Sequence, residues 1–252
     1  MRAKKRLGQN FLQDAAIIAQ IIQLIRPEQS QQIIEIGPGT GALTDHLAEV
    51  GVPLSLIEFD QDLIAPLQQR FRQHKHVTIY HQDALQLKLN QGSYLVVGNL
   101  PYNISSPLLI NLLKQSNHIQ RGVFMLQKEL VQRICAPPGV KAFGRLSVML
   151  QHRFDCYAAL TVPPEAFKPV PKVDSQIIEL IPKINPTEVD ITSLEFIVKQ
   201  AFAQRRKTIR NNLKKWFSDD ELQSFHIDPQ QRPETLLVTQ YEQLAQQYHA
   251  HH

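Results

Sequence analysis

The chain has 252 residues, a formal net charge of +4 and 43% apolar residues, which is enough to bury a full core in one large domain or in a medium and a small one. Its two cysteines, Cys135 and Cys156, exclude a disulfide framework and lack metal-ligand spacing, so we expect reduced thiols in a cytoplasmic protein and no metal site. No apolar run approaches the ~20 residues of a membrane span, so we expect no membrane association, and nothing demands more than a monomer.

The first 127 residues alternate amphipathic segments with short apolar runs. Asp14 is placed to cap a helix from Ala15 to about Ile25, which Pro27 ends. Strands are then expected over 32–36, 53–58, 76–80, 94–97 and 122–127, with helices over 42–50, 61–73 and 107–114. Alternating strands and helices predict an α/β fold with a parallel, doubly wound, Rossmann-like sheet.

The pattern changes after Lys128. Helices are expected over 129–135 and 146–151, and strand-like runs over 154–160 and 176–180 flank a loop rich in proline. Beyond Asn185-Pro186-Thr187 the chain reads as helices only. We therefore predict two domains, residues 1–184 with the sheet and a small all-α domain over residues 185–252.

The first strand of the sheet runs into a turn with three glycines, Gly37, Gly39 and Gly41. Glycines let the backbone pass close beneath a bulky ligand, and the carboxyl end of a parallel strand is where such sheets hold nucleotide-like cofactors. The last spacing of the dinucleotide fingerprint is missing. Glu35, just before the turn, is expected to fix the loop through backbone amides.

Two carboxylates follow at the ends of the next two strands. Glu58 suits the two hydroxyls of a ribose, and Asp83 could accept a hydrogen bond from an adenine amino group. Each has a structural alternative, Glu58 as a solvated strand end and Asp83 as a helix cap. With the glycine turn they predict a cleft for an adenosine without pyrophosphate, which favours S-adenosylmethionine over NAD.

Asn99-Leu100-Pro101-Tyr102 follows the fourth strand, beside the predicted cleft. This loop suits methylation of an exocyclic amino group, whose lone pair is delocalised into the ring. Two acceptors, the Asn99 side-chain oxygen and the Leu100 carbonyl, could hold such a nitrogen near the tetrahedral geometry of attack. Tyr102 can stack on the target ring. The alternative is an ordinary turn.

These motifs, in this order, resemble the rRNA adenine N6,N6-dimethyltransferase family over essentially the whole chain. The stretches that carry the resemblance are 8–12, 35–41, 99–105, 127–129, 143–147, 162–164 with Phe167, 171–175 and 205–208. The nearer branch is the bacterial small-subunit one. The resemblance therefore implies transfer of methyl groups from S-adenosylmethionine to N6 of two adjacent adenosines near the 3′ end of 16S rRNA, in a small subunit or its precursor.

The resemblance also implies roles for single residues. The cofactor site would comprise Asn10 and Leu12, which close over it, and Gly37, Glu58, Asp83 and Asn99, with Ala84 flanking the adenine. The catalytic residues would be Asn99, Leu100, Pro101, Tyr102 and Phe167. Phe167 would face Tyr102 across the target base, although composition alone would make it a core residue.

The segment Gln204–Lys215 is strongly basic. It carries Arg205, Arg206, Lys207, Arg210, Lys214 and Lys215, and further cations occur in the arm Met1–Arg6 and at Lys141, Arg145, Arg153, Lys168 and Lys172. We expect one helix here, with Phe202, Ile209, Leu213 and Trp216 packed inward. Such a helix can be an ordinary solvated face, but this set could neutralise RNA phosphates. We therefore predict that residues 185–252 bind RNA.

Three other functions remain open. A resistance-type 23S rRNA adenine N6-methyltransferase belongs to the same superfamily, and the stretches 143–147 and 205–215 argue against it. A non-catalytic RNA-binding assembly factor is disfavoured because Glu58, Asp83 and Asn99 are intact. An NAD-linked oxidoreductase is disfavoured by the glycine spacing.

Overall fold

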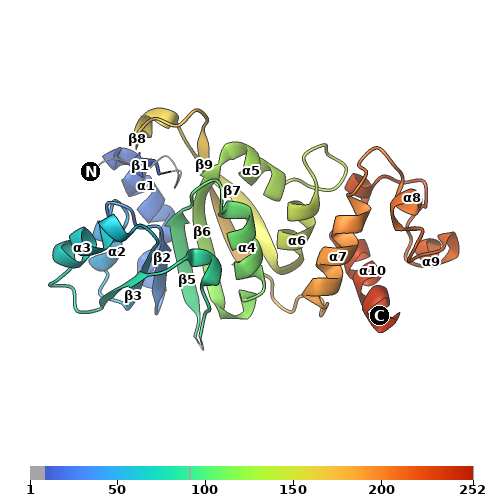
Figure 1. The fold of residues 1–252 in the computed structure, drawn as a ribbon, viewed down its shortest axis with the longest axis horizontal. Coiled ribbons are helices and arrows are strands. Elements are labelled where there is room, and N and C mark those ends of the chain that lie inside the picture. Colours follow the sequence, from blue (N-terminus) through green and yellow to red (C-terminus); the bar gives the residue numbers. More distant parts are fainter. Residues whose placement is uncertain (1–8, 91, 252) are drawn as a thin grey trace. The chain divides into compact units, whose positions relative to one another are not determined.

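The computed structural model of the chain describes residues 9–90 and 92–251, so the basic arm Met1–Arg6 lies outside the described residues (Figure 1). These residues form two compact units. Unit 1 contains the described residues up to Val131 together with Tyr157–Pro182, and unit 2 contains Gln132–Cys156 and the described residues from Lys183 onward. The chain passes from unit 1 to unit 2 for the second time after Pro182, close to the domain boundary expected after residue 184. Residues 132–156, expected in the first domain, instead belong to unit 2, where their helix packs on the C-terminal helices.

Unit 1 is built on a seven-stranded sheet with the order β4-β3-β2-β5-β6-β9-β7. The strands are β2 (Ile33–Ile36), β3 (Leu54–Glu58), β4 (Val77–His81), β5 (Tyr94–Asn99), β6 (Ile119–Gln127), β7 (Phe154–Val162) and β9 (Ser175–Pro182). The five strands from β4 to β6 are parallel to their neighbours, whereas β9 runs antiparallel to β6. The chain order reverses between β2 and β5, and such a switch point is where α/β sheets bind ligands.

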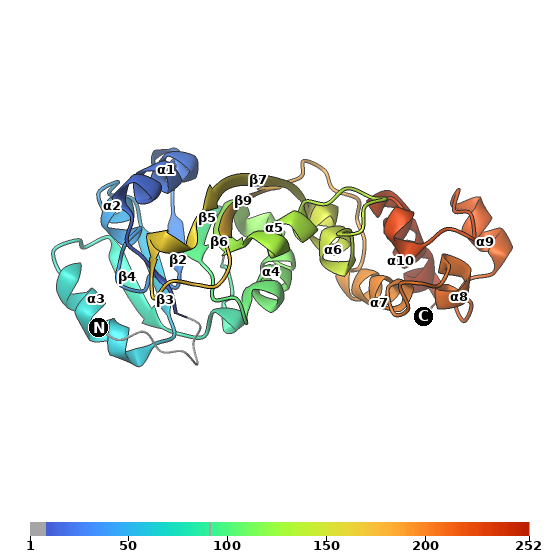
Figure 2. The same cartoon turned by 90° about the horizontal axis from the view of Figure 1, so that it is seen from above.

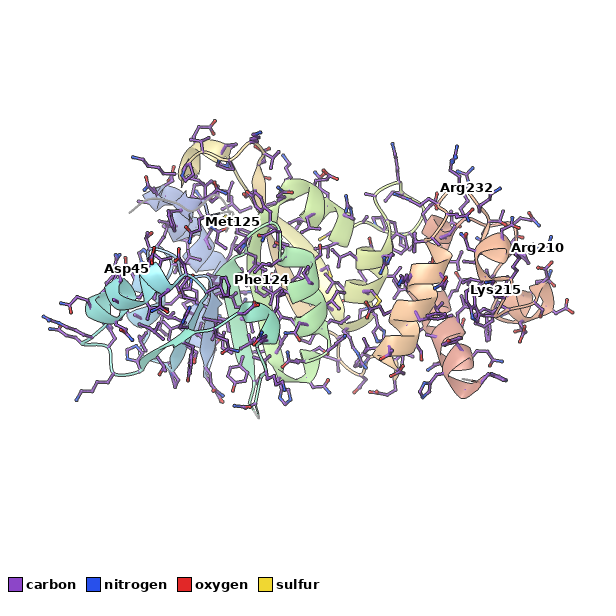
Figure 3. The ribbon with its side chains drawn as sticks, viewed as in Figure 1. Asp45, Phe124, Met125, Arg210, Lys215 and Arg232 are labelled. Atoms are coloured by element: carbon purple, nitrogen blue, oxygen red, sulfur yellow. The ribbon has the colours of Figure 1, made fainter. Side chains whose placement is uncertain are left out.

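Helices cover both faces of this sheet. Figure 1 shows α1 (Ala15–Ile25), α2 (Thr44–Ala48) and α3 (Gln61–Arg70) on one side of the central strands and α4 (Ser105–Leu113) on the other. The predicted Asp14 cap is confirmed, since its Oδ1 accepts from the Ala16 and Ile17 amides. Neighbouring strand residues such as Phe124 and Met125, labelled in Figure 3, alternate between the faces, and Met125 joins the core under α1–α3. The α/β, Rossmann-like prediction is confirmed.

A two-stranded sheet ties the start of the described chain to the proline-rich loop. β1 (Phe11–Leu12) pairs antiparallel with β8 (Phe167–Lys168), with Leu12 opposite Phe167. Gln13 N donates to the Ala166 carbonyl at 2.8 Å, just beyond this pair. The 3₁₀ helices among the described residues are η2 (Pro27–Gln29), η3 (Ala84–Gln86), η4 (Ser116–His118), η5 (Pro164–Ala166) and η6 (Pro233–Thr235).

Unit 2 is helical. Its helices are α6 (Arg145–Arg153), α7 (Ile191–Ala201), α8 (Ile209–Leu213), α9 (Asp219–Ser224) and α10 (Val238–His251), preceded by the end of α5 (Lys128–Ile134) (Figure 2). The buried side chains of His152 and Glu242 join α6 to α10 through a 2.7 Å hydrogen bond. No strand occurs among the described residues after Pro182, as the sequence predicts for its C-terminal domain.

The basic segment does not form one helix. Residues 204–208 lie in turns, and only α8 is helical between α7 and Lys215. Two side chains explain the break. Asn212 donates to the Ala201 and Gln204 carbonyls at the end of α7, and Thr208 caps α8 by accepting from the Asn211 amide. Each of these bonds satisfies a helix-end group that a continuous helix would bond internally.

Candidate functional site

A cavity of about 310 Å³ opens at the carboxyl ends of β2, β3 and β5. Segments far apart in the sequence meet there. Its lining residues are Gln9–Leu12, Glu35, Gly37–Thr40, Ala42, Leu43, Glu58, Phe59, Asp83, Leu85 and Asn99–Ile104. The cavity therefore brings together the predicted cofactor residues except Ala84 and, of the catalytic set, Asn99 to Tyr102.

The glycine turn forms one wall of the cavity. Gly37 and Gly39 have φ angles of 68° and 59°, in the left-handed region that favours glycine. A Cβ atom at Gly37 would lie 3.6 Å from the Asn99 carbonyl oxygen, and one at Gly39 would lie 3.2 Å from the Phe11 ring. The turn thus fits between the N-terminal segment and the Asn99 loop, where a side chain would be strained and crowded.

Glu58, rather than Glu35, fixes the glycine turn. Its Oε2 accepts from the Gly39 amide at 3.2 Å, and its Oε1 accepts from the Asp60 amide at 2.8 Å. Burial raises the pKa of Glu58, although these backbone hydrogen bonds oppose the change. Each carboxylate oxygen keeps a second lone pair, so Glu58 can still accept from a ligand hydroxyl.

Glu35 is directed away from the turn amides that the sequence suggested for it. Its Oε2 accepts from the Thr44 hydroxyl at 2.7 Å, which links β2 to α2. Burial, with repulsion from Glu58, raises the pKa of Glu35 to about 8. The prediction that Glu35 holds the loop through backbone amides is therefore wrong, because Glu58 at the end of the next strand occupies that place.

Asp83 both caps a helix and faces the cavity. Its Oδ1 accepts from the Leu85 amide at 2.9 Å and begins η3, and its side chain is half-buried in the cavity wall. The two interpretations of Asp83 are therefore compatible, since only one carboxylate oxygen takes part in the cap. Ala84 is buried behind it, and the side chain that reaches the cavity here is Leu85.

The Asn99 loop is fixed on both sides. Asn99 Nδ2 donates to the Asn10 carbonyl at 3.1 Å, so the other end of this amide, Oδ1, is an acceptor. The Leu100 amide donates to Met125 on β6 at 3.1 Å. The Pro101 carbonyl accepts from the Ile104 amide and the Ser105 hydroxyl, whereas no donor of the described residues bonds the Leu100 carbonyl. Two acceptors are thus available beside the cavity.

Of the two predicted aromatic residues, Tyr102 lines the cavity and Phe167 does not. Tyr102 lines the cavity, and its hydroxyl lies 3.1 Å from Ser175 Oγ. Phe167 is 3% exposed and belongs to the core under α1, where β8 pairs with β1, and the cavity-lining residues do not include it. In this conformation Phe167 has the core position that composition indicates, and a role opposite Tyr102 remains a prediction that requires it to leave the core.

Several cavity residues were not predicted from the sequence. Gln9 Nε2 donates to Asp60 Oδ2 at 2.8 Å and ties the start of the described chain to the end of β3. Phe11 and Phe59 also line the cavity, and Phe59 is 57% exposed. Each is a direct sequence neighbour of a predicted residue. The sequence could therefore have indicated them, because residues that flank a ligand-binding residue on a tight loop often line the same site.

The cations of unit 2 fall into two groups. Some are bound within the unit: Arg205 donates to the Lys141 carbonyl, Arg210 pairs with Asp219, and Arg153 lies 3.8 Å from Glu188. Four more are exposed, and their side chains make no hydrogen bond or ion pair with described residues: Arg206, Lys207, Lys214 and Lys215. Figure 3 labels Arg210 and Lys215 on this part of unit 2. In unit 1, Lys168 and Lys172 are exposed.

Comparison with known proteins identifies the family. The family described as "Ribosomal RNA adenine dimethylase" matches residues 1–250. The chain belongs to this family. It is 47% identical to ribosomal RNA small subunit methyltransferase A of Hydrogenovibrio crunogenus, over 98% of this chain and 96% of the relative. It is 45% identical to the protein of the same name from Coxiella burnetii, over 96% of each chain.

Solved structures agree on the fold. A dimethyladenosine transferase from Plasmodium falciparum superposes with a TM-score of 0.84 at 24% identity, covering 95% of this chain and 98% of that one. The 23S rRNA methyltransferase ErmE superposes with a TM-score of 0.74 at 24% identity, covering 95% and 100%. Within residues 9–90 and 92–251, no helix is long and apolar enough to cross a membrane, and no cluster of three metal-ligating side chains occurs.

Proposed function

We propose that this member of the rRNA adenine dimethylase family transfers methyl groups from S-adenosylmethionine to N6 of two adjacent adenosines near the 3′ end of 16S rRNA, during small-subunit assembly. The choice of the small subunit is supported by the relatives that are 45–47% identical, whose names specify it. The likeness to ErmE, at 24% identity, is a likeness of fold alone. A ribosomal substrate also places the protein in the cytoplasm, and we expect a monomer.

The observation that carries this proposal is the orientation of the Asn99 amide. Its NH₂ group donates to the Asn10 carbonyl, which leaves Oδ1 as an acceptor beside the cavity. A site that receives an adenine amino group needs acceptors at this point, because the amino hydrogens must be held while nitrogen moves out of the ring plane. The Leu100 carbonyl, held rigid before Pro101, supplies the second acceptor.

The cavity fits S-adenosylmethionine in size and in the chemistry of its walls. Its volume of about 310 Å³ lies within the range of small-molecule sites, and glycine backbone forms one wall. We assign Glu58 to the ribose hydroxyls and the second oxygen of Asp83 to the adenine amino group. Asn10, Leu12, Gly37 and Asn99 complete the cofactor set. S-adenosylmethionine, when bound, supplies an electrophilic methyl group.

The chain's own residues orient the adenine amino group that receives the methyl group, and they do not need to remove its proton before attack. Asn99 Oδ1 and the Leu100 carbonyl each accept a hydrogen bond from the amino group, and Tyr102 stacks on the target ring. No strong base is required, because the attacked nitrogen becomes acidic as its new bond forms. After one transfer a single N–H remains, so one acceptor contact survives and the pocket accepts a methyl group in place of the other.

The exposed cations of unit 2 would bind RNA phosphates. The side chains of Arg206, Lys207, Lys214 and Lys215 form no ion pair with described residues, so phosphate binding would break none. Phosphate contacts do not read sequence, so the shape of the RNA and its exposed loop bases must select the target. The target adenine must leave its stack to reach Asn99.

The test is methyl transfer to separated ribosomal subunits that lack the modification. The purified chain is incubated with methyl-labelled S-adenosylmethionine and either small or large subunits, and the labelled nucleosides are analysed by mass spectrometry. We expect label only in the small subunit, as N6-methyladenosine and then N6,N6-dimethyladenosine. Label in the large subunit would instead support a 23S rRNA methyltransferase. Binding of the particle without S-adenosylmethionine binding or transfer would support an assembly factor.

A further inference from the structure

The side chain of Tyr102 is held at its far end by a residue outside the cavity. Its hydroxyl lies 3.1 Å from Ser175 Oγ, a hydrogen-bond distance at which either oxygen can donate. Tyr102 is half-buried and lines the cavity, whereas Ser175 is 1% exposed and is not among the lining residues. Ser175 thus does not line the cavity itself but is hydrogen-bonded to a residue that does.

Ser175 is itself held firmly in the sheet. It is the first residue of β9 and lies opposite Gln127 on β6, and β6 pairs on its other side with β5, where Asn99 lies opposite Met125. The preceding residue, Asp174, is bound twice by Lys128: its carbonyl accepts from the Lys128 amide at 3.0 Å, and Oδ2 lies 3.1 Å from Nζ. Ser175 thus has a fixed position relative to the strand that carries Asn99.

The backbone next to Tyr102 is held by different contacts. The Pro101 carbonyl accepts from the Ile104 amide at 3.1 Å and from the Ser105 hydroxyl at 2.9 Å. These bonds fix the path of the loop but leave rotation about the side-chain bonds of Tyr102 unrestrained. The hydrogen bond to Ser175 restrains that rotation, because it fixes the hydroxyl at the other end of the ring.

We propose that Ser175 is a positioning residue that sets the orientation of the Tyr102 ring, the surface on which the target adenine stacks. This inference rests on the proposed methyl transfer. The second transfer should depend on it more than the first. Once one methyl is in place, only one acceptor contact to the amino group remains, so stacking contributes more to the position of the nitrogen. Asp174 and Lys128 support this arrangement by fixing the start of β9.

The test compares Ser175→Ala, Tyr102→Phe and the double variant in the full chain, with unmethylated small subunits as substrate. Each single variant removes one side of the same hydrogen bond. We expect each to lower kcat/KM for the second transfer by roughly three- to tenfold, the loss expected for one neutral hydrogen bond, so that N6-methyladenosine accumulates. The double variant should be no worse than either single one, because the bond is already absent.

Three controls separate positioning from a general structural role. Ser175→Thr keeps the hydroxyl and should restore the wild-type ratio of monomethyl to dimethyl product. Ser116→Ala removes a buried serine of unit 1 away from the cavity and should leave that ratio unchanged. S-adenosylmethionine affinity, measured by calorimetry, should be the same in all variants, because Ser175 does not line the cavity and Tyr102→Phe removes only the hydroxyl that bonds Ser175.

Additive losses in the double variant, or an unchanged product ratio in Tyr102→Phe, would overturn the role of Ser175 while leaving methyl transfer by the wild type intact. Absence of transfer by the wild type itself would contradict the proposed function instead. The Tyr102→Phe variant keeps Ser175, so it decides the question even where Ser175→Ala fails to fold.

Discussion

The cavity wall of unit 1 and the basic surface of unit 2 hold their polar groups in opposite ways. At the cavity, the side chains of Glu58, Asp83 and Asn99 are each fixed by hydrogen bonds: both carboxylate oxygens of Glu58 accept from backbone amides, whereas Asp83 and Asn99 each keep one oxygen without such a bond. In unit 2, Lys214 and Lys215 are exposed and have no partner among the described residues. Under the proposed function, methyl transfer would depend on fixed geometry at the cavity, and RNA binding would depend on side chains of unit 2 that are free to change conformation.

This difference predicts how substitutions will act. A change at the cavity should alter the rate of methyl transfer and respond little to salt, because its hydrogen bonds act at fixed short range. A change among the exposed cations should alter affinity and its salt dependence, and leave the rate at saturating substrate unchanged. Four variants test how the two units use their polar groups.

The largest effect is expected from Asn99→Ala. It removes one of the two acceptors for the amino group, and loss of one transition-state hydrogen bond typically costs ~10²-fold in kcat. The measurement is single-turnover methylation of small subunits at saturating S-adenosylmethionine, which excludes a simple loss of cofactor affinity. Near-normal turnover would refute the role assigned to Asn99.

Glu35→Gln should change how stability depends on pH. The pKa of Glu35 is raised to about 8, so between pH 4.5 and 8 the folded state binds more protons than the unfolded chain, and wild-type stability falls as the pH rises. Glutamine cannot ionise and can still accept from Thr44. The stability of the variant relative to wild type should therefore rise by up to about 3 kcal/mol from pH 5 to pH 7.5, since each pKa unit corresponds to about 1.4 kcal/mol. Urea unfolding followed by circular dichroism measures this, with the exposed Glu165→Gln as the control.

Glu242→Gln should show the opposite trend in unit 2. Burial would raise the pKa of Glu242, but hydrogen bonds from His152 and Thr187 outweigh it and lower that pKa. The stabilisation by the ionised carboxylate is therefore present above pH 4.5 and lost as the pH falls. The wild type should be more stable than the variant at pH 6, by less than the Glu35 effect, and lose this advantage towards pH 4. The single tryptophan, Trp216, lies in unit 2, so its fluorescence in urea reports this unit. An advantage that grows at low pH would contradict this assignment.

The smallest effect is expected from replacing both Lys214 and Lys215 by glutamine. Affinity for the small subunit should fall by roughly two- to fivefold, and the slope of log K against log salt should decrease by about 1 to 2, because each lost phosphate contact contributes about 0.7–0.9. Arg210→Gln is the matched control, since Arg210 already pairs with Asp219. An equal change of slope in both variants would show that exposure does not decide which cations bind RNA.

The sequence predicted most of the fold and the location of the site. Period and capping signals placed α1 from Ala15 to Ile25 with Asp14 as its cap, and the cavity lies at the glycine turn as expected. These features depend on local sequence, since a cap, a glycine with positive φ and a short apolar run each act within a few residues.

The errors concern contacts between distant segments. Glu58 took the place predicted for Glu35 because the turn amide of Gly39 faces the end of β3, which no local pattern encodes. The burial of Phe167 also depends on such a contact, the pairing of β8 with β1, and its predicted role opposite Tyr102 stays a prediction. Residues 132–156 belong to unit 2 because His152 meets Glu242, 90 residues away. The prediction of a single basic helix was wrong, because Asn212 bonds the end of α7 and Thr208 caps the start of α8.

The proposed function requires that this chain makes N6,N6-dimethyladenosine in 16S rRNA. The most direct measurement is mass spectrometry of the 3′ region of 16S rRNA from cells that lack the protein and from the same cells supplied with wild type or Asn99→Ala. We predict two adjacent adenosines without methyl groups in the deleted cells, both dimethylated with wild type, and little or no methylation with Asn99→Ala. Two dimethylated adenosines in the cells that lack the protein would contradict the proposed function. Full restoration of methylation by Asn99→Ala would contradict the role of Asn99.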